Sequence, residues 1–113
     1  MLRNAMPDLP EEALDALGNA ERRRLLGVLA GGPLSVGDIT KSFAISRPAI
    51  SRHLRILETA RLVRHEAAGT RNLYALDRAG FVATAAWLSG FWDEAETRLR
   101  LVAENLAEKQ GDD

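Results

Sequence analysis

Three arginines and a serine, spaced for one side of a helix, are the residues of this chain best suited to bind another molecule. They lie within residues 46–62 and are Arg47, Ser51, Arg52 and Arg55. Arginine can bond guanine bidentately, serine can bond a base or a phosphate, and cations displace counterions from a duplex. Arginines alone would favour a solvated surface helix, so the nucleic-acid interpretation depends on the flanking elements.

The sequence of residues 46–62 predicts one short helix that can hold these side chains. Ser46 is suited to be the N-cap, and Pro48 is tolerated in the first turn, where its missing N–H has no helical partner. Ile50, Leu54 and Leu57 follow at helical spacing and form an apolar stripe on the opposite side. One face is therefore expected to be buried while the polar face stays outside.

A second short helix is predicted immediately before the first. Ser35 and Asp38 have the spacing of a capping box, and Val36, Ile39 and Phe43 supply an apolar face. The connection at residues 44–45 is long enough only for a tight turn. Two short helices joined in this way, the second with a basic face, form a helix-turn-helix.

A β-hairpin is predicted after the arginine-bearing helix. Residues 62–67 and 71–76 have β-type composition, and Gly69 between them suits a tight turn. The cations Arg64 and Arg71 lie on its two arms. After a helix-turn-helix such a hairpin would be a wing that lies along the DNA backbone or in the minor groove; the alternative is an edge hairpin with solubilising charges.

Composition sets limits on the function. The chain has 113 residues, a net charge of −1 and no cysteine, which excludes disulfides and thiolate metal sites. Residues 46–78 hold seven arginines against three acidic residues, a local charge of +4. A nucleic-acid surface must therefore be a local patch. We find no bilayer-spanning apolar run and no signal peptide, and expect a cytoplasmic location.

The N-terminal part is expected to start with a loose arm over residues 1–7. A helix is predicted over residues 8–18, with Asp8 as cap and Gly18 at its end, and another over residues 20–30 after Asn19. Arg22, Arg23 and Arg24 cluster near the start of this second helix. Cations there oppose the helix macrodipole, so they are expected either in solvent or against phosphate.

A long last helix is predicted over residues 77–108, with Asp77 as its cap. Its apolar residues recur in heptad-like steps of four and three, so the stripe is suited to a two-fold partner. Alternatively, the first helix covers this stripe inside one subunit, and both arrangements can hold together. The predicted dimer interface is Leu9, Leu14, Leu17, Leu88, Trp92, Ala95, Leu99, Val102 and Leu106.

With these elements in this order, the chain resembles the ArsR (ArsR/SmtB) family of winged helix-turn-helix regulators. Residues 46–63 are similar to the family's pattern around Ser-x-His-Leu, residues 19–26 resemble its second-helix opening, and residues 69–76 match its wing. The resemblance implies a mainly α fold with a small β-hairpin, about five helices and a two-stranded wing, as one domain over residues 1–113. Residues 35–76 would read DNA, and residues 8–18 and 77–108 would form the dimer.

Two positions depart from the family pattern. Arg61 replaces a glycine, so the turn into the wing has to form without the residue that best tolerates left-handed backbone. Ser35, Val36 and Gly37 replace the Cys-Val-Cys of metal-sensing members and cannot bind a soft ion. The last helix has no histidine, so we expect no metal and no other cofactor.

The resemblance implies a homodimeric transcriptional repressor of a near-palindromic operator, commonly released by an inducer. Its DNA-binding residues would be Ser46, Arg47, Pro48, Ser51, Arg52, His53, Arg55, Arg64 and Arg71, with His53 either bracing the helix or bonding the DNA backbone. We expect no enzyme, since the sequence has no Cys nucleophile, no His–acid pair in a plausible pocket and no phosphate-binding glycine loop. The alternative is a winged-helix interaction module that does not read DNA. Trp87, Phe91 and Trp92 would form either core or an inducer pocket.

Overall fold

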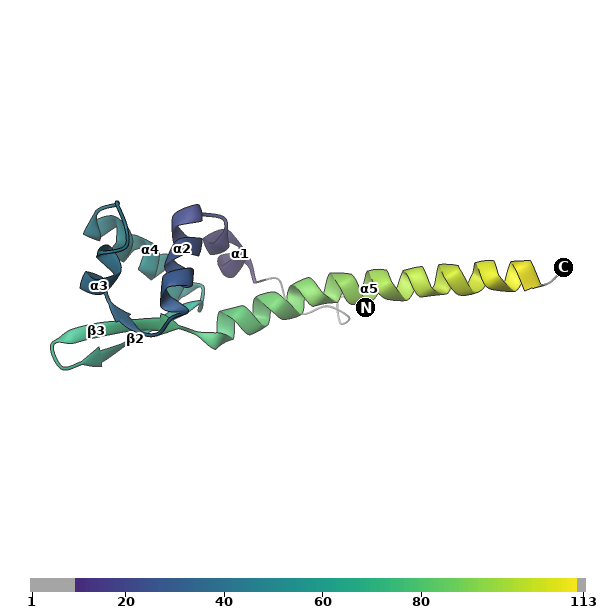
Figure 1. Ribbon diagram of the computed structural model, residues 1–113. Helices are drawn as coiled ribbons and strands as arrows, with labels where there is room; N and C mark the ends of the chain where they lie inside the picture. The colour runs from purple at the N-terminus through teal and green to yellow at the C-terminus, as the bar shows by residue number, and fades with distance from the viewer. Residues whose placement is uncertain (1–9, 112–113) are drawn as a thin grey trace. The chain divides into compact units, whose positions relative to one another are not determined.

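The computed structural model describes residues 10–111, which contain five helices and three strands (Figure 1). The chain divides into two compact units, one of Pro10–Thr84 and one that contains the last helix from Ala85 onward, and each is described by itself. The elements in chain order are α1 Glu11–Leu17, α2 Ala20–Leu29, β1 Leu34–Ser35, α3 Val36–Thr40, α4 Arg47–Thr59, β2 Val63–Ala68, β3 Arg71–Leu76 and α5 Arg78–Gly111. The mainly helical winged fold predicted from the sequence is confirmed.

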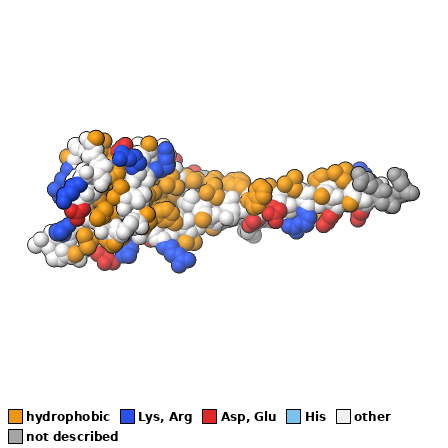
Figure 2. All heavy atoms as spheres, in the orientation of Figure 1, with side chains coloured by type: hydrophobic (Ala, Val, Ile, Leu, Met, Phe, Trp, Pro, Cys, Tyr) orange, Lys and Arg blue, Asp and Glu red, His pale blue; other side chains and the backbone are white. Residues whose placement is uncertain are grey.

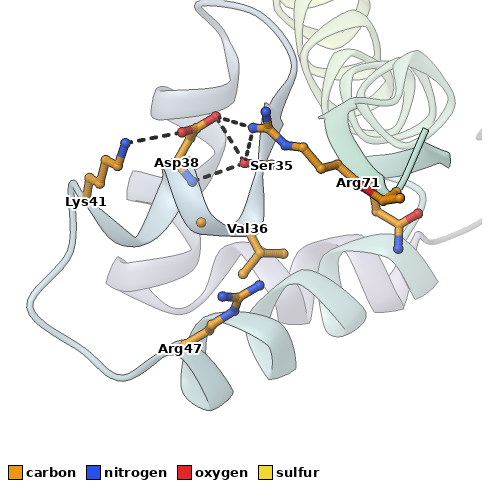
Figure 3. A pocket seen from close by; sticks show the side chains of 9 residues that line it. Ser35, Val36, Asp38, Lys41, Arg47 and Arg71 are labelled. Carbon is orange, nitrogen blue, oxygen red and sulfur yellow. Dashed lines mark hydrogen bonds and ion pairs between the residues drawn. The ribbon is translucent and has the colours of Figure 1, made fainter. Parts of the chain in front are cut away.

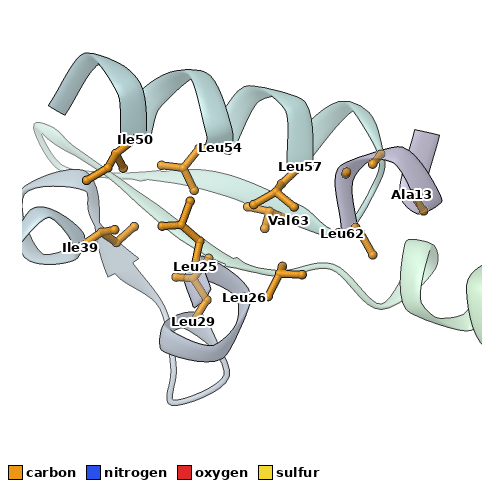
Figure 4. Packing of buried hydrophobic residues seen from close by; sticks show 12 residues of the cluster. Ala13, Leu25, Leu26, Leu29, Ile39, Ile50, Leu54, Leu57, Leu62 and Val63 are labelled. Carbon is orange, nitrogen blue, oxygen red and sulfur yellow. The ribbon is translucent and has the colours of Figure 1, made fainter. Parts of the chain in front are cut away.

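The core of the first unit lies between α2, α3, α4 and the start of β2 (Figure 4). Ile50, Leu54 and Leu57 of α4 are fully buried, as the apolar stripe predicted. They pack in one cluster with Leu25 of α2 and Ile39 of α3. Burying a side chain of this size contributes about 1.5–3 kcal/mol, so this cluster sets the orientation of α4.

The sheet has three antiparallel strands in the order β1-β3-β2. The two-stranded wing was predicted, but β1 was not: it pairs Leu34 with Tyr74 and Ser35 with Leu73. A two-residue strand shows no period of its own, and only its partner β3 defines it. The pairing attaches the wing to the residue that starts α3.

Helix α1 begins at Glu11, with Pro10 at the N-cap position, later than the predicted start at residue 8. Asp8 and Leu9, and the predicted arm over residues 1–7, lie outside the described residues. Ala13 and Ala16 are buried, and Leu17 packs against the core cluster of the first unit.

Helix α4 ends in a Schellman motif, three residues before the end of the predicted stretch. Leu62 donates its N–H to Leu57 O and Arg61 donates to Glu58 O, both over 3.0 Å. Arg61 has φ +59°, the left-handed conformation that glycine adopts most easily. The turn that was expected to lack its usual residue is thus made by an arginine in strained backbone.

Helix α5 is capped by Asp77, which accepts the N–H of Ala79 over 3.0 Å. It continues to Gly111, so residues 110 and 111, predicted as part of a frayed tail, are helical. No helix of the described chain combines the length and apolarity that crossing a lipid bilayer requires.

Candidate nucleic-acid interface

Helix α4 presents the predicted polar face opposite its buried stripe. Ser46 caps the helix by accepting the Ala49 N–H over 3.3 Å, as predicted. The side chains on this face are exposed, except Ser51, which is half-buried; they are Arg47, Pro48, Ser51, Arg52 and Arg55. Within residues 10–109 the α4 arginines take part in none of the seven ion pairs. Their charges are thus available to an external anion.

His53 lies at the border between α4 and α2. Its Nδ1 atom is 3.4 Å from Nη1 of Arg22, and the ring is half-buried. Burial, followed by the Arg22 guanidinium, lowers the pKa of His53 below its ordinary value, with Glu21 opposing the shift. The contact favours the bracing role for His53 over exposure on the outer face.

Arg55 lines a small hollow of about 300 Å³ between α1 and α4. Glu12 and Asp15 of α1, with Ile56 and Thr59 of α4, complete the lining. Arg55 is therefore placed beside acidic side chains, whereas Arg47 lies at the other end of α4, beside the wing.

The wing is a tight hairpin whose turn depends on Gly69. Ala68 pairs with Arg71, and Gly69 has φ +67°, as the first central residue of a two-residue turn requires. Arg71 lies next to this turn. Its Nη2 donates to Ser35 Oγ over 2.8 Å and to Asp38 Oδ2 over 2.9 Å (Figure 3). The structure therefore connects the cationic wing tip to α3.

Arg64 points away from α4. It alternates along β2 with His65, which contacts Glu58 of α4 and stacks beside Tyr74, so Arg64 lies on the other face of the sheet. There it pairs with Glu66 over 2.6 Å. The structure does not bring Arg64 together with the α4 arginines.

The three arginines of α2 have partners within the protein, and Arg23 and Arg24 are also exposed to solvent, as expected. Arg22 donates to Ala16 O over 2.8 Å and Arg23 to Leu17 O over 2.8 Å, so both bind carbonyls at the C-terminal end of α1. Cations are favourable there because that helix end carries partial negative charge. Arg24 lies over the Phe43 ring at 4.7 Å and pairs with Glu21.

Lys41 is a further cation of this region, and nothing in the sequence indicated it. It follows α3, is exposed, and lies 3.5 Å from Asp38 Oδ1. It shares the lining of one open hollow with Arg47 and Arg71. No sequence signal distinguishes it from a solvated lysine, because the fold alone brings Arg71 of the wing to the same hollow.

The C-terminal unit exposes large apolar side chains along α5 (Figure 2). Leu99 is 64% exposed and Leu88 54% exposed. Of the predicted interface residues on this helix, Trp92, Val102 and Leu106 are also exposed and Ala95 is half-buried. Trp87 packs edge-to-face on Phe91 at 4.7 Å, as neighbours on one helix face. A surface of this kind is typical of an interface.

The described residues contain no cluster of three or more His, Cys, Asp or Glu side chains that could hold a metal ion. Ser35 and Asp38 bond each other and Arg71 instead. The position that is Cys-Val-Cys in metal-sensing members thus has a different structural use in this chain.

Residues 19–65 match the family described as "Bacterial regulatory protein, arsR family". A curated relative, the HTH-type transcriptional regulator Rv2034 of Mycobacterium tuberculosis, is 42% identical over 92% of this chain and 94% of its own length. The transcriptional repressor SdpR of Bacillus subtilis is 32% identical over 74% of this chain and 93% of its own.

A solved structure supports the same relationship. The crystal structure of the ArsR family transcriptional regulator RHA00566 superposes with a TM-score of 0.72 at 30% identity. The match covers 80% of this chain and 97% of that one. It therefore extends over nearly the whole fold of that regulator.

Proposed function

Because this chain belongs to the arsR family of bacterial regulatory proteins, we propose that it is a transcriptional repressor that binds double-stranded DNA. It acts as a homodimer on a near-palindromic operator. The family comprises regulators rather than enzymes, and we propose no catalytic role for any residue. With chromosomal DNA as its target, the expected site of action is the cytoplasm.

One observation supports the proposal more than the others. Helix α4 is anchored by a buried apolar face, while its outer face carries three arginines that form no ion pair within the described residues. An α-helix fits the major groove, where arginine can bond guanine O6 and N7. Arg52, which is exposed, is the proposed base-reading residue. Ser46, Arg47, Pro48 and Ser51 are proposed to contact the adjacent backbone or bases.

His53 and Arg64 take different parts in this proposal. His53 positions α4 through its contact with Arg22. Arg64 lies on the sheet face that points away from α4 and pairs with Glu66. It therefore contributes to the long-range attraction of DNA rather than to a contact beside α4. Arg55 is proposed to add charge at the C-terminal half of α4, and Arg71 to contact the backbone from the wing.

The dimer is proposed to form through the exposed apolar face of α5, joined by α1 residues. A symmetric pair would place two α4 helices on successive major grooves, about one helical turn apart. The operator should therefore have two-fold symmetry. Protection of a site without dyad symmetry would contradict the dimeric arrangement.

We infer that any inducer is not a thiophilic metal held at the start of α3. Serine, valine and glycine at positions 35–37 offer no thiolate or imidazole. Operator binding titrated with zinc, cadmium and arsenite tests this inference. Release of DNA at micromolar metal would overturn it.

The decisive experiment compares Arg52→Ala with the wild-type protein on an operator fragment selected from genomic DNA and on a random duplex. Loss of a base contact should weaken operator binding by about 1–3 kcal/mol and change random binding less. Arg98→Ala is the matched control, because Arg98 lies on α5 in an ion pair with Glu94. Equal loss on both duplexes would make Arg52 a phosphate contact; absence of binding by the wild-type protein would leave the interaction-module alternative.

A further inference from the structure

An open hollow of about 560 Å³ lies between α3, the first residue of α4 and the tip of the wing. Its basic lining residues are Lys41, Arg47 and Arg71, and Asp38 is its acidic one. Figure 3 shows Lys41 and Arg71 approaching Asp38 from opposite sides, with Arg47 beside Val36. Helix α3, the start of α4 and the distant wing therefore bring three cations to one hollow, and two of them, Lys41 and Arg71, contact its carboxylate.

Both carboxylate oxygens of Asp38 contact neighbouring side chains. Oδ2 accepts from Arg71 Nη2 at 2.9 Å and from Ser35 Oγ at 3.0 Å, and Oδ1 lies 3.5 Å from Lys41 Nζ. The Ser35 hydrogen bond, then the charges of Arg71 and Lys41, lower the pKa of Asp38. The carboxylate is therefore ionised at neutral pH and neutralises part of the charge in the hollow.

The cations keep capacity for a second anion. Arg71 makes both of its hydrogen bonds among the described residues through Nη2, although a guanidinium has five N–H donors. Arg47 is in none of the ion pairs of residues 10–109. With three positive charges against one negative charge, the hollow suits an oxyanion.

We propose that this hollow binds a phosphate of the DNA backbone through Lys41, Arg47 and Arg71, and that Asp38 competes with that phosphate for Lys41 and Arg71. The proposal rests on the proposed function, because it assigns a backbone contact to the same DNA-binding surface. A phosphodiester presents two oxygens to a guanidinium much as a carboxylate does. Phosphate contacts carry no sequence information, so Asp38 should weaken binding to all DNA alike.

The test is Asp38→Asn, measured on the selected operator fragment and on a random duplex over a range of salt. The amide oxygen can still accept the Ser35 hydrogen bond, so the start of α3 is kept. Removing one negative charge about 4 Å from the phosphate site should raise affinity for both duplexes about fivefold. Lys41→Gln should lower both affinities and reduce the salt slope by about 0.9, the value for one lost phosphate contact.

Glu66→Gln is the matched control for Asp38→Asn. It removes the same charge from the wing, but Glu66 does not line the hollow and pairs with Arg64 rather than with Lys41, Arg47 or Arg71. If Asp38→Asn raises the affinity for DNA clearly more than Glu66→Gln does, the result supports competition in the hollow. Equal increases in affinity would show only a net-charge effect, and a lower affinity of Asp38→Asn would show that Asp38 orients the cations. Either result would overturn the proposal.

Two further measurements separate other causes of failure. Urea unfolding and circular dichroism of each variant show whether the fold is kept, and Arg71→Gln should reduce the gain from Asp38→Asn when the two are combined. If Asp38→Asn raises DNA affinity as much in the Arg71→Gln background as in the wild-type protein, competition for Arg71 is contradicted. Binding by the wild-type protein tests the proposed function itself, independently of the difference between the variants.

Discussion

Gly80 donates its backbone N–H to the carbonyl oxygen of Arg61 over 2.7 Å. This bond joins the first turn of α5 to the left-handed residue of the Schellman motif that follows α4. The approach is close because Gly80 is buried and has no Cβ. The turn after α4 and the start of α5 are therefore held together by a backbone hydrogen bond.

We predict that Gly80→Ala strongly destabilises the protein. A Cβ at this position would lie 2.4 Å from Arg61 O and 2.8 Å from Ala60 O, and both are backbone atoms that cannot rotate away. Overpacking of this kind typically costs about 1–3 kcal/mol, sometimes more. Urea unfolding measures the change.

Gly27→Ala is the control for that substitution. Gly27 lies within α2, and apart from the neighbouring backbone of that helix a Cβ there would meet no atom within 4 Å. Alanine should stabilise a helix interior by about 0.5–1 kcal/mol relative to glycine. Similar destabilisation by the two substitutions would contradict a specific contact at Gly80.

Arg61→Gly is predicted to stabilise the fold. Arg61 has φ +59°, which costs a residue with a Cβ about 1–2 kcal/mol and costs glycine little. The gain is partly offset by the greater entropy of glycine in the unfolded chain, so we expect about 1 kcal/mol in urea unfolding. Arg61→Ala removes the charge but keeps the Cβ, and a comparable gain from it would contradict the backbone explanation.

Helix α4 could be predicted closely because its determinants are local. The cap at Ser46, Pro48 in the first turn and the stripe of Ile50, Leu54 and Leu57 all act within one helix. The hairpin turn could be predicted for the same reason, since Gly69 and its neighbours define it. Local capping and periodicity therefore sufficed to predict α4 and the wing.

The partners of individual cations could not be predicted, because tertiary structure supplies them. The carbonyls that bind Arg22 and Arg23 belong to the end of α1, and the carboxylate that binds Arg71 is 33 residues away in α3. Arg64 is different: its partner Glu66 is two residues along the same strand, and strand alternation alone places both on one face. That signal was present in the sequence.

His53 is predicted to make folding stability depend on pH. Burial and the Arg22 guanidinium lower its pKa in the folded state below the ordinary value of 6.5. The folded protein then binds fewer protons at this site than the unfolded chain, so the contribution of His53 is fully present above pH 6.5 and is lost as pH falls through the folded-state pKa.

His53→Gln isolates this contribution. Unfolding free energies of the variant and the wild-type protein should converge as the pH is lowered from about 7.5 to about 5, because protonated His53 faces the Arg22 cation. Urea unfolding at a series of pH values makes the comparison. A difference between the two proteins that does not change with pH would contradict the prediction.

Leu99→Glu is predicted to convert the proposed dimer to monomers and to abolish tight operator binding. Leu99 is 64% exposed on α5, within the apolar face assigned to the interface. In a two-fold interface each substitution occurs twice, so two buried leucines are lost and two carboxylates lose water. The dissociation constant of the dimer should rise about 100-fold or more, which analytical ultracentrifugation would measure.

Thr97→Glu is the control. It introduces the same charge on the opposite side of the helix, as helical spacing indicates, and it should leave both association and DNA binding nearly unchanged. If Leu99→Glu remained dimeric, the α5 face would not be the interface; if it became monomeric yet bound the operator as tightly as before, DNA recognition would not require the symmetric pair.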